Sequence, residues 1–228
     1  MSKENSETLE KRTGKEIAKR YALFVLSLLV MAIGVAVTKK GDMGVSPISS
    51  TANVMSMKFT ALSLGNWLII WNCVLIVGQI AVLRRKFQLI QMLQLPLSFL
   101  FGYFTDFAMW LVSPIHVEAY PLRLAMVLLG TVILGAGVTM SVIANVIMNS
   151  GEAFVKAISD TWHKEFGNVK LVFDICCVVL AVVLSLILFN FTIVGAREGT
   201  VIAALCTGWV VKFFKPRMDG PLERILTR

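Results

Sequence analysis

Six long apolar runs constrain this chain more than any other feature of its sequence. Each is close to the roughly 20 residues that a helix needs to cross a lipid bilayer. Backbone groups cannot stay unpaired in hydrocarbon, and the alternating pattern of barrel strands is absent, so the runs predict helices. The predicted fold class is all-α, a polytopic membrane helix bundle of six spans, at residues 21–38, 64–83, 89–112, 122–144, 169–190 and 199–214.

Composition supports this class and excludes others. The chain is 57% hydrophobic and 16% charged, whereas a soluble domain carries about 25% charged residues. The net charge of +8 comes from basic residues at the chain ends and in the short gaps between apolar runs, which is typical of a membrane protein rather than a nucleic-acid binder. No catalytic motif or metal-ligand spacing is present. We therefore expect no enzyme, no cofactor, no metal and no nucleic-acid partner.

The placement of lysine and arginine predicts the orientation. Most of them fall in the N-terminal tail, in Arg84-Arg85-Lys86, around Lys164 and in the C-terminal tail, which the positive-inside rule assigns to the cytoplasm. We expect both termini to be cytoplasmic. Residues 1–20 would form a basic N-tail, 113–121 an external loop and 215–228 a C-tail.

Two connections carry a helical pattern of their own. The first begins at Ser46, a potential cap, and Pro47, which suits a first turn; the second has a polar face with Glu152. We expect amphipathic helices that lie at an interface or dip part-way into the bundle, with Ser46, Ser49, Asn53 and Glu152 facing solvent. The apolar positions are Val45, Ile48, Ala52, Met55 and Phe59 in the first, and Phe154, Ile158, Trp162 and Phe166 in the second.

The order span, amphipathic helix, span, span occurs twice, in residues 21–112 and 122–214. A repeat of three spans is odd, so its second copy must enter the membrane upside down, as in many transporters. The sequence thus predicts two inverted three-span repeats. Matching positions are Gly34-Val35 and Gly137-Val138, Gly65-Asn66 and Gly167-Asn168, Asn72 and Asp174, and Gly102 and Gly208.

Two short stretches resemble a known family. Residues 41–47, GDMGVSP, resemble the Gly-x-Ser-Pro entry to the first amphipathic helix of YczE/YitT-type bacterial membrane proteins, and residues 198–208, EGTVIAALCTG, resemble that family's opening of the last span. The resemblance extends from about Tyr21 to Pro216 and implies a bacterial inner membrane. Glu198 replaces the small residue that is usual there, and the resemblance implies no particular activity.

Two charged residues within the spans are candidates for function. A charge in a span costs about 2.5–3.5 kcal/mol on insertion scales, so it usually faces the bundle interior or water. Asp106 and Asp174 would serve a substrate or a proton. Alternatively, Asp106 forms a structural ion pair with Arg123 or His116, and Asp174 is solvated at the cytoplasmic end.

Polar residues at matching positions of the two halves are the other candidates. Gln91, Gln94 and Pro96 interrupt the third span, and Glu198 and Thr200 begin the sixth. Such interruptions are the best sequence indication of a transporter's site; the alternative is hydrogen bonding between helices. We expect a shared cavity with Glu198 at its outer rim, and the predicted substrate-binding residues are Gln91, Gln94, Asp106, Asp174, Glu198 and Thr200.

The favoured function is a small-solute permease or secondary transporter in the lipid bilayer, working by alternating access where spans three and six meet. A homodimer is possible because one bundle offers little wall for a pathway. One alternative is the substrate-binding membrane subunit of a vitamin uptake system. Another is an accessory or regulatory membrane protein that transports nothing.

Overall fold

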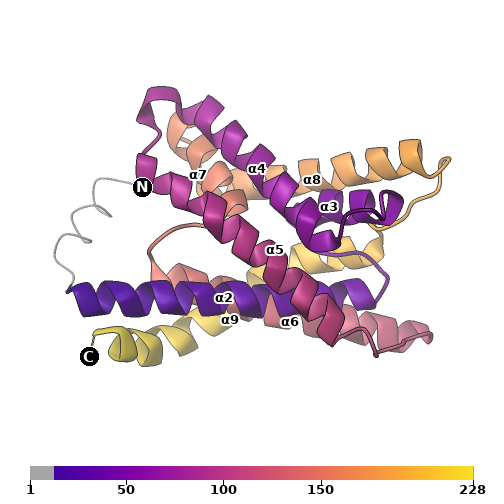
Figure 1. Ribbon diagram of the computed structural model, residues 1–228, viewed down its shortest axis with the longest axis horizontal. Coiled ribbons are helices and arrows are strands. Elements are labelled where there is room, and N and C mark those ends of the chain that lie inside the picture. Colours follow the sequence, from indigo (N-terminus) through magenta and orange to yellow (C-terminus); the bar gives the residue numbers. More distant parts are fainter. Residues whose placement is uncertain (1–12, 228) are drawn as a thin grey trace.

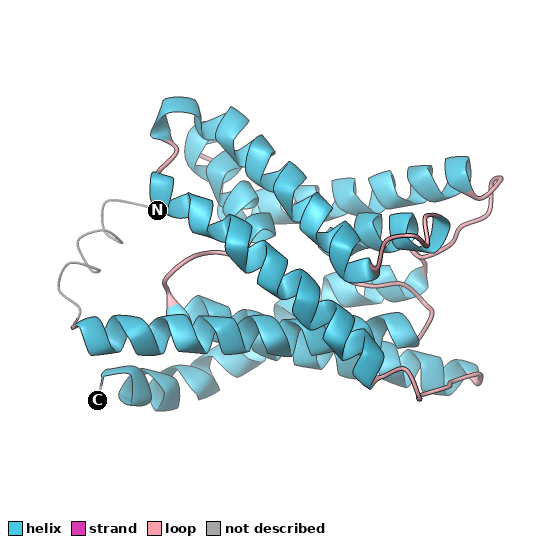
Figure 2. Ribbon diagram, viewed as in Figure 1, coloured by secondary structure: helices cyan, strands magenta, loops and turns pink. Residues whose placement is uncertain are grey.

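The computed structural model describes residues 13–227, which are all-helical, with no strand among them (Figures 1 and 2). The all-α class is therefore confirmed; the first twelve residues of the predicted N-tail lie outside the described part. The helices are α2 (Gly14–Lys40), α3 (Pro47–Lys58), α4 (Leu64–Leu83), α5 (Gln94–Leu111), α6 (Tyr120–Ala144), α7 (Ser150–Trp162), α8 (Phe166–Leu188) and α9 (Glu198–Thr227), with 3-10 turns at Arg84–Lys86 and Leu89–Leu93.

Four helices are long and apolar enough to cross a membrane: α2, α4 with its following turn, α6 and α8. Helices α5 and α9 coincide with the other two predicted spans. Polar and charged side chains, such as Asp106 in α5 and Lys212 in α9, lower their apolar character. The structure thus supports four spans, and the count of six stays a prediction.

The surface of the bundle is apolar. Helix α8 exposes a row of branched side chains to its surroundings, and α5 exposes aromatic ones. A soluble monomer rarely exposes an apolar patch of this extent, whereas lipid solvates it well. The exposed residues are Leu171, Val172, Ile175, Val179, Val183 and Ile187 on α8, and Phe99, Tyr103, Phe107 and Trp110 on α5.

The helices at the chain ends extend further than the apolar runs. Helix α2 begins at Gly14, inside the predicted N-tail, and α9 continues through the predicted C-tail to Thr227. Arg20 joins the two extensions, because its buried guanidinium donates to Glu223 of α9 at 2.7 Å. At the third run, Pro96 lies in the first turn of α5, where proline is tolerated. The predicted interruption of the third span at Gln91, Gln94 and Pro96 therefore corresponds to the turn before α5 and the start of that helix.

Helices α2 and α6 pack at the centre of the bundle through small residues. A Cβ atom on Gly34 would lie 2.6 Å from the backbone nitrogen of Leu134, and one on Gly137 would lie 2.8 Å from the backbone nitrogen of Met31. Only glycine allows the backbones to approach this closely. Gly34 thus packs on Leu134 while Gly137 packs on Met31, and the predicted repeat matches Gly34 with Gly137.

Helices α3 and α7 insert into the bundle, and their N-terminal turns meet. Helix α3 packs mainly on α8, and α7 mainly on α4; a Cβ on Gly151 of α7 would lie 2.8 Å from Cδ1 of Ile48 in α3. The expectation that Ser49 and Asn53 face solvent is wrong, since both are buried. Asn53 instead donates to the Gly195 carbonyl at 2.7 Å.

Candidate functional site

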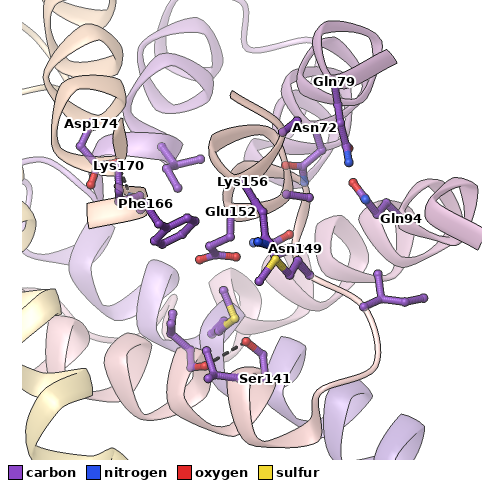
Figure 3. A pocket seen from close by; sticks show the side chains of 18 of the residues that line it. Asn72, Gln79, Gln94, Ser141, Asn149, Glu152, Lys156, Phe166, Lys170 and Asp174 are labelled. Carbon is purple, nitrogen blue, oxygen red and sulfur yellow. Dashed lines mark hydrogen bonds and ion pairs between the residues drawn. The ribbon is translucent and has the colours of Figure 1, made fainter. Parts of the chain in front are cut away.

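A cavity of about 800 Å³ lies within the bundle, where the N-terminal turns of α3 and α7 face helices α4, α6, α8 and α9 (Figure 3). It reaches the surface at Lys86 and Gln88, beside the turn that follows α4. We call this the Arg84 end of the bundle; the opposite end, where α2 ends and α4 begins, is the Asp106 end. The described residues that line the cavity include none from the Asp106 end. The mouth at Lys86 and Gln88 is therefore at the Arg84 end.

Three amide side chains in the wall of the cavity are buried and incompletely paired. Asn72, Gln79 and Gln94 are only 4%, 2% and 3% exposed. The Asn72 Nδ2, Gln79 Oε1 and Gln94 Oε1 atoms have no hydrogen-bond partner within the described chain. An unsatisfied buried polar group costs about 1–3 kcal/mol. Most such groups in proteins are paired, so three of them in the wall of one cavity make this part of the bundle unusually polar.

Local helix geometry brings these amides together. Asn72 and Gln79 are seven residues apart on α4, which is two turns, so both face α7 and the cavity. Gln94 is the first residue of α5. Gln79 donates through Nε2 to Gln91 Oε1 at 3.3 Å, and in Figure 3 the amide ends of Gln79 and Gln94 point toward one another.

Most charged side chains in the cavity pair within their own helix. On α8, Lys170 donates to Asp174 one turn further along. On α7, Lys156 donates to Asp160 at 3.1 Å. These i,i+4 pairs lie toward the Arg84 end, and their charges cancel.

Glu152 differs from the other acids of the cavity. It is the third residue of α7, and its carboxyl group points into the cavity beside Phe166 (Figure 3). Within the described chain it forms no ion pair and accepts a hydrogen bond only from its own backbone N–H. Burial raises the pKa of Glu152, the nearby charge of Lys170 opposes part of that rise, and the charge of Asp174 adds to it.

The remaining wall is mainly apolar. The deep part is formed by side chains of α2, α4, α5 and α6. A mostly apolar pocket with a few convergent polar groups is typical of small-molecule sites. These apolar residues are Met31, Val35, Leu68, Trp71, Phe101 and Leu134.

The predicted site residues divide into two groups. Gln91, Gln94 and Asp174 line the cavity, whereas Asp106, Glu198 and Thr200 do not. The expectation that Thr200 shares a cavity with the two glutamines is therefore wrong. The reason is geometric, because the first turn of α9 lies at the Asp106 end while α5 begins at the Arg84 end.

Asp106 caps a helix. Its carboxylate accepts from Ser63 Oγ at 2.5 Å and from the Gly65 backbone N–H at 2.8 Å, at the start of α4. Neither predicted partner contacts it, since Arg123 pairs with Asp42 at 3.4 Å and His116 bonds the Pro114 carbonyl. A carboxylate at a helix N-terminus satisfies backbone donors, so this contact is structural.

Glu198 and Thr200 also lie at the Asp106 end. Glu198 is exposed and pairs with Arg197 at 3.2 Å. Gly199 donates its N–H to the Met43 carbonyl at 2.8 Å, and Thr200 is buried against Gly44, whose φ is +114°. Residues 41–47 and residues 198–208 therefore contact each other, and they hold α9 against the loop before α3.

Sequence reasoning missed Gln79 and misplaced Glu152, which was expected to face solvent. The spacing of Asn72 and Gln79 within an apolar run was an available signal for a polar stripe on one helix face. Asn72 had been matched with Asp174 as a repeat position, and both line the cavity.

An all-helical bundle with an apolar surface and four helices able to cross a bilayer is compatible with a multi-pass membrane protein. The chain belongs to the family of unknown function DUF6198, which matches residues 18–216. No curated protein and no solved structure matches it.

Proposed function

We propose that this protein is a small-solute permease whose substrate binds in the central cavity. The observation that carries the proposal is the set of buried, unpaired amides of Asn72, Gln79 and Gln94 around a volume that holds a metabolite. A bundle that served only to stabilise a partner would gain stability from apolar side chains at these positions. In a permease the same amide side chains line the path of a polar solute.

Two inverted repeats account for the architecture. The reciprocal packing of Gly34 on Leu134 and Gly137 on Met31 is what a two-fold axis between α2 and α6 requires. The same axis accounts for α3 packing on α8 while α7 packs on α4. In this arrangement α5 and α9 also cross the membrane, giving six spans, and the cavity lies near the axis, as in many transporters.

The two halves differ in how their last two helices pack, and this difference supports alternating access. We call the α4–α5 contact and the α8–α9 contact the two seams. Helices α4 and α5 pack tightly where Gly65 meets Gly102, toward the Asp106 end. Their counterparts are Gly167 of α8 and Gly208 of α9. Gly208 has nothing within 4 Å of an added Cβ, and Gly167 has only the Glu165 side chain. If the halves exchanged conformations, the α8–α9 seam would close, the α4–α5 seam would open, and access would move to the other end.

The positive-inside rule favours a cytoplasmic location for the Arg84 end, and in that orientation the mouth of the cavity would face inward. The YczE/YitT resemblance adds a bacterial inner membrane as the location. Labelling of a cysteine at His116 by an impermeant reagent, in a cysteine-free background in intact cells, tests this orientation. Labelling there only after the inner face is exposed contradicts it.

A thermal-shift screen of the purified protein against metabolites tests the permease. A ligand raises the apparent stability of the folded state by mass action. The double variant Asn72→Leu/Gln94→Met should lose that stabilisation. The control Glu198→Gln, at the far end of the bundle, should keep it.

Two results would contradict the proposal. One is a folded protein that no solute stabilises. The other is a solute that stabilises wild type and the double variant equally, because it then binds outside the cavity. Either result would favour the accessory-protein alternative.

A further inference from the structure

We propose that the solute carries a positively charged amino group, and that this group binds the Glu152 carboxylate. The inference rests on the proposed function, since it names the substrate class of the same cavity. Four observations support it: the pairing of the other charges, the position of Glu152, the chemistry of the wall and the open path to solvent.

Glu152 is the acid of the cavity that lacks a counter-ion. Asp160 and Asp174 are occupied by Lys156 and Lys170 on their own helices. The remaining cation of the wall, Lys86, lies at the exposed rim. The lining residues of α3, α4, α5, α6 and α9 are all uncharged. No cation in the described chain therefore pairs with Glu152.

A half-buried carboxylate without a counter-ion is unfavourable, so it takes up a proton or pairs with a cation. In the empty cavity the proton is the available partner, and burial accordingly raises the pKa of this group. A bound ammonium group offers a second partner. The proton and the amine then compete for the same carboxylate.

Binding of the ammonium group replaces the proton on Glu152. The O–H bond of the Glu152 carboxyl breaks, its proton passes to water through the open Arg84 end, and the carboxylate accepts hydrogen bonds from the N–H groups of the ammonium. One proton leaves for each cation bound. A carrier that must hold either partner exchanges amine for proton across the membrane.

The rest of the cavity suits an amine with a polar and an apolar part. Asn72, Gln79 and Gln94 offer hydrogen bonds, while Trp71 and Phe101 offer apolar surface. The N-terminal turns of α3 and α7 each carry about half a positive charge. Glu152, at the third position of α7, already uses one of them. An anion would be repelled by the ionised carboxylate, and a neutral solute would leave the carboxyl group with its proton and form no ion pair with it.

Three probes with the same body separate these classes: phenethylamine, 2-phenylethanol and phenylacetate. Their effect on the unfolding temperature of the purified full chain should be measured from about pH 5 to about pH 9, across the range where a carboxyl with a raised pKa titrates. The variants are Glu152→Gln and the matched control Glu165→Gln, an exposed glutamate outside the cavity.

We expect phenethylamine alone to stabilise the wild type. Its affinity should fall about tenfold for each pH unit below the pKa of Glu152. Glu152→Gln should weaken binding about 30-fold or more and remove the pH dependence, while Glu165→Gln should change neither.

Equal stabilisation by the alcohol or the carboxylate, unchanged amine binding in Glu152→Gln, or no effect of the amine would each overturn the inference. A non-cationic ligand found in the metabolite screen would overturn it while leaving the permease in place. Failure of every solute in the metabolite screen would instead contradict the permease itself.

Discussion

Gly65 of α4 and Gly102 of α5 cross so closely that a Cβ atom on Gly65 would overlap the Gly102 carbonyl oxygen, and one on Gly102 would lie 2.8 Å from the Gly65 carbonyl oxygen. Gly167 of α8 and Gly208 of α9, which the proposed repeat matches with them, make no such contact. If the repeat holds, equivalent positions occupy a closed seam in one half and an open seam in the other.

Alanine should destabilise the protein at the α4–α5 seam and should not destabilise it at the α8–α9 seam. Gly102→Ala forces a methyl group into Ile69 and the Gly65 backbone, and overpacking of this kind costs about 1–3 kcal/mol. Gly208→Ala enters open space and should be neutral or gain up to about 1 kcal/mol from helix propensity. Unfolding temperatures of the two variants in the same detergent make the comparison. Equal losses would contradict the closed and open assignments.

Asp106 should matter for stability and not for solute binding. Asp106→Ala removes both acceptor oxygens at the start of α4 and should cost about 1–2 kcal/mol. Asp106→Asn keeps one oxygen for the Gly65 N–H and should cost less. Unfolding temperature and ligand-induced shift, measured together, test this. A lost ligand response in a stable variant would return Asp106 to the binding site.

Gln94→Met should stabilise the empty protein and weaken binding. It replaces a buried, unpaired oxygen with an apolar side chain of similar shape, and such an exchange gains about 1 kcal/mol. The control Gln88→Met alters an exposed glutamine and should leave the unfolding temperature unchanged. A destabilised Gln94→Met protein would show that the amide is satisfied in the native bundle.

The stability of the protein should depend on pH through Glu152. Its pKa is raised above the ordinary value of 4.5, so the folded state binds this proton more tightly than the unfolded state. The contribution is therefore complete below about 4.5 and is lost as pH rises through the higher folded-state pKa. Unfolding temperatures of wild type and Glu152→Gln should agree at low pH, with the variant more stable at neutral pH. A less stable variant at neutral pH would mean that Lys170 holds the carboxylate ionised.

Much of the fold was predictable because one physical rule applies along most of the chain. Apolar runs predict helices in lipid, and Pro47 and the pattern around Glu152 predict α3 and α7. The burial of α3 was less predictable, because serine and asparagine resemble a solvated face until a partner such as the Gly195 carbonyl is known.

The site was only partly predictable. Gln91, Gln94 and Asp174 could be found, because polar groups in apolar runs tend to face the interior. The position of Thr200 could not, since the sequence does not state that α9 begins at the Asp106 end against Met43. The role of Asp106 depends on Ser63 and Gly65, which are distant in sequence.

Disulfide formation between Gly167→Cys and Gly208→Cys, in a cysteine-free background in native membranes, tests alternating access most directly. The pair Ser63→Cys/Asp106→Cys, whose native side chains are in contact, reports the closed α4–α5 seam. We predict that both pairs cross-link. A disulfide at the 63–106 pair should prevent a solute from crossing the membrane, because the α4–α5 seam then stays closed. A 167–208 pair that never cross-links, while the 63–106 pair does, would contradict the account.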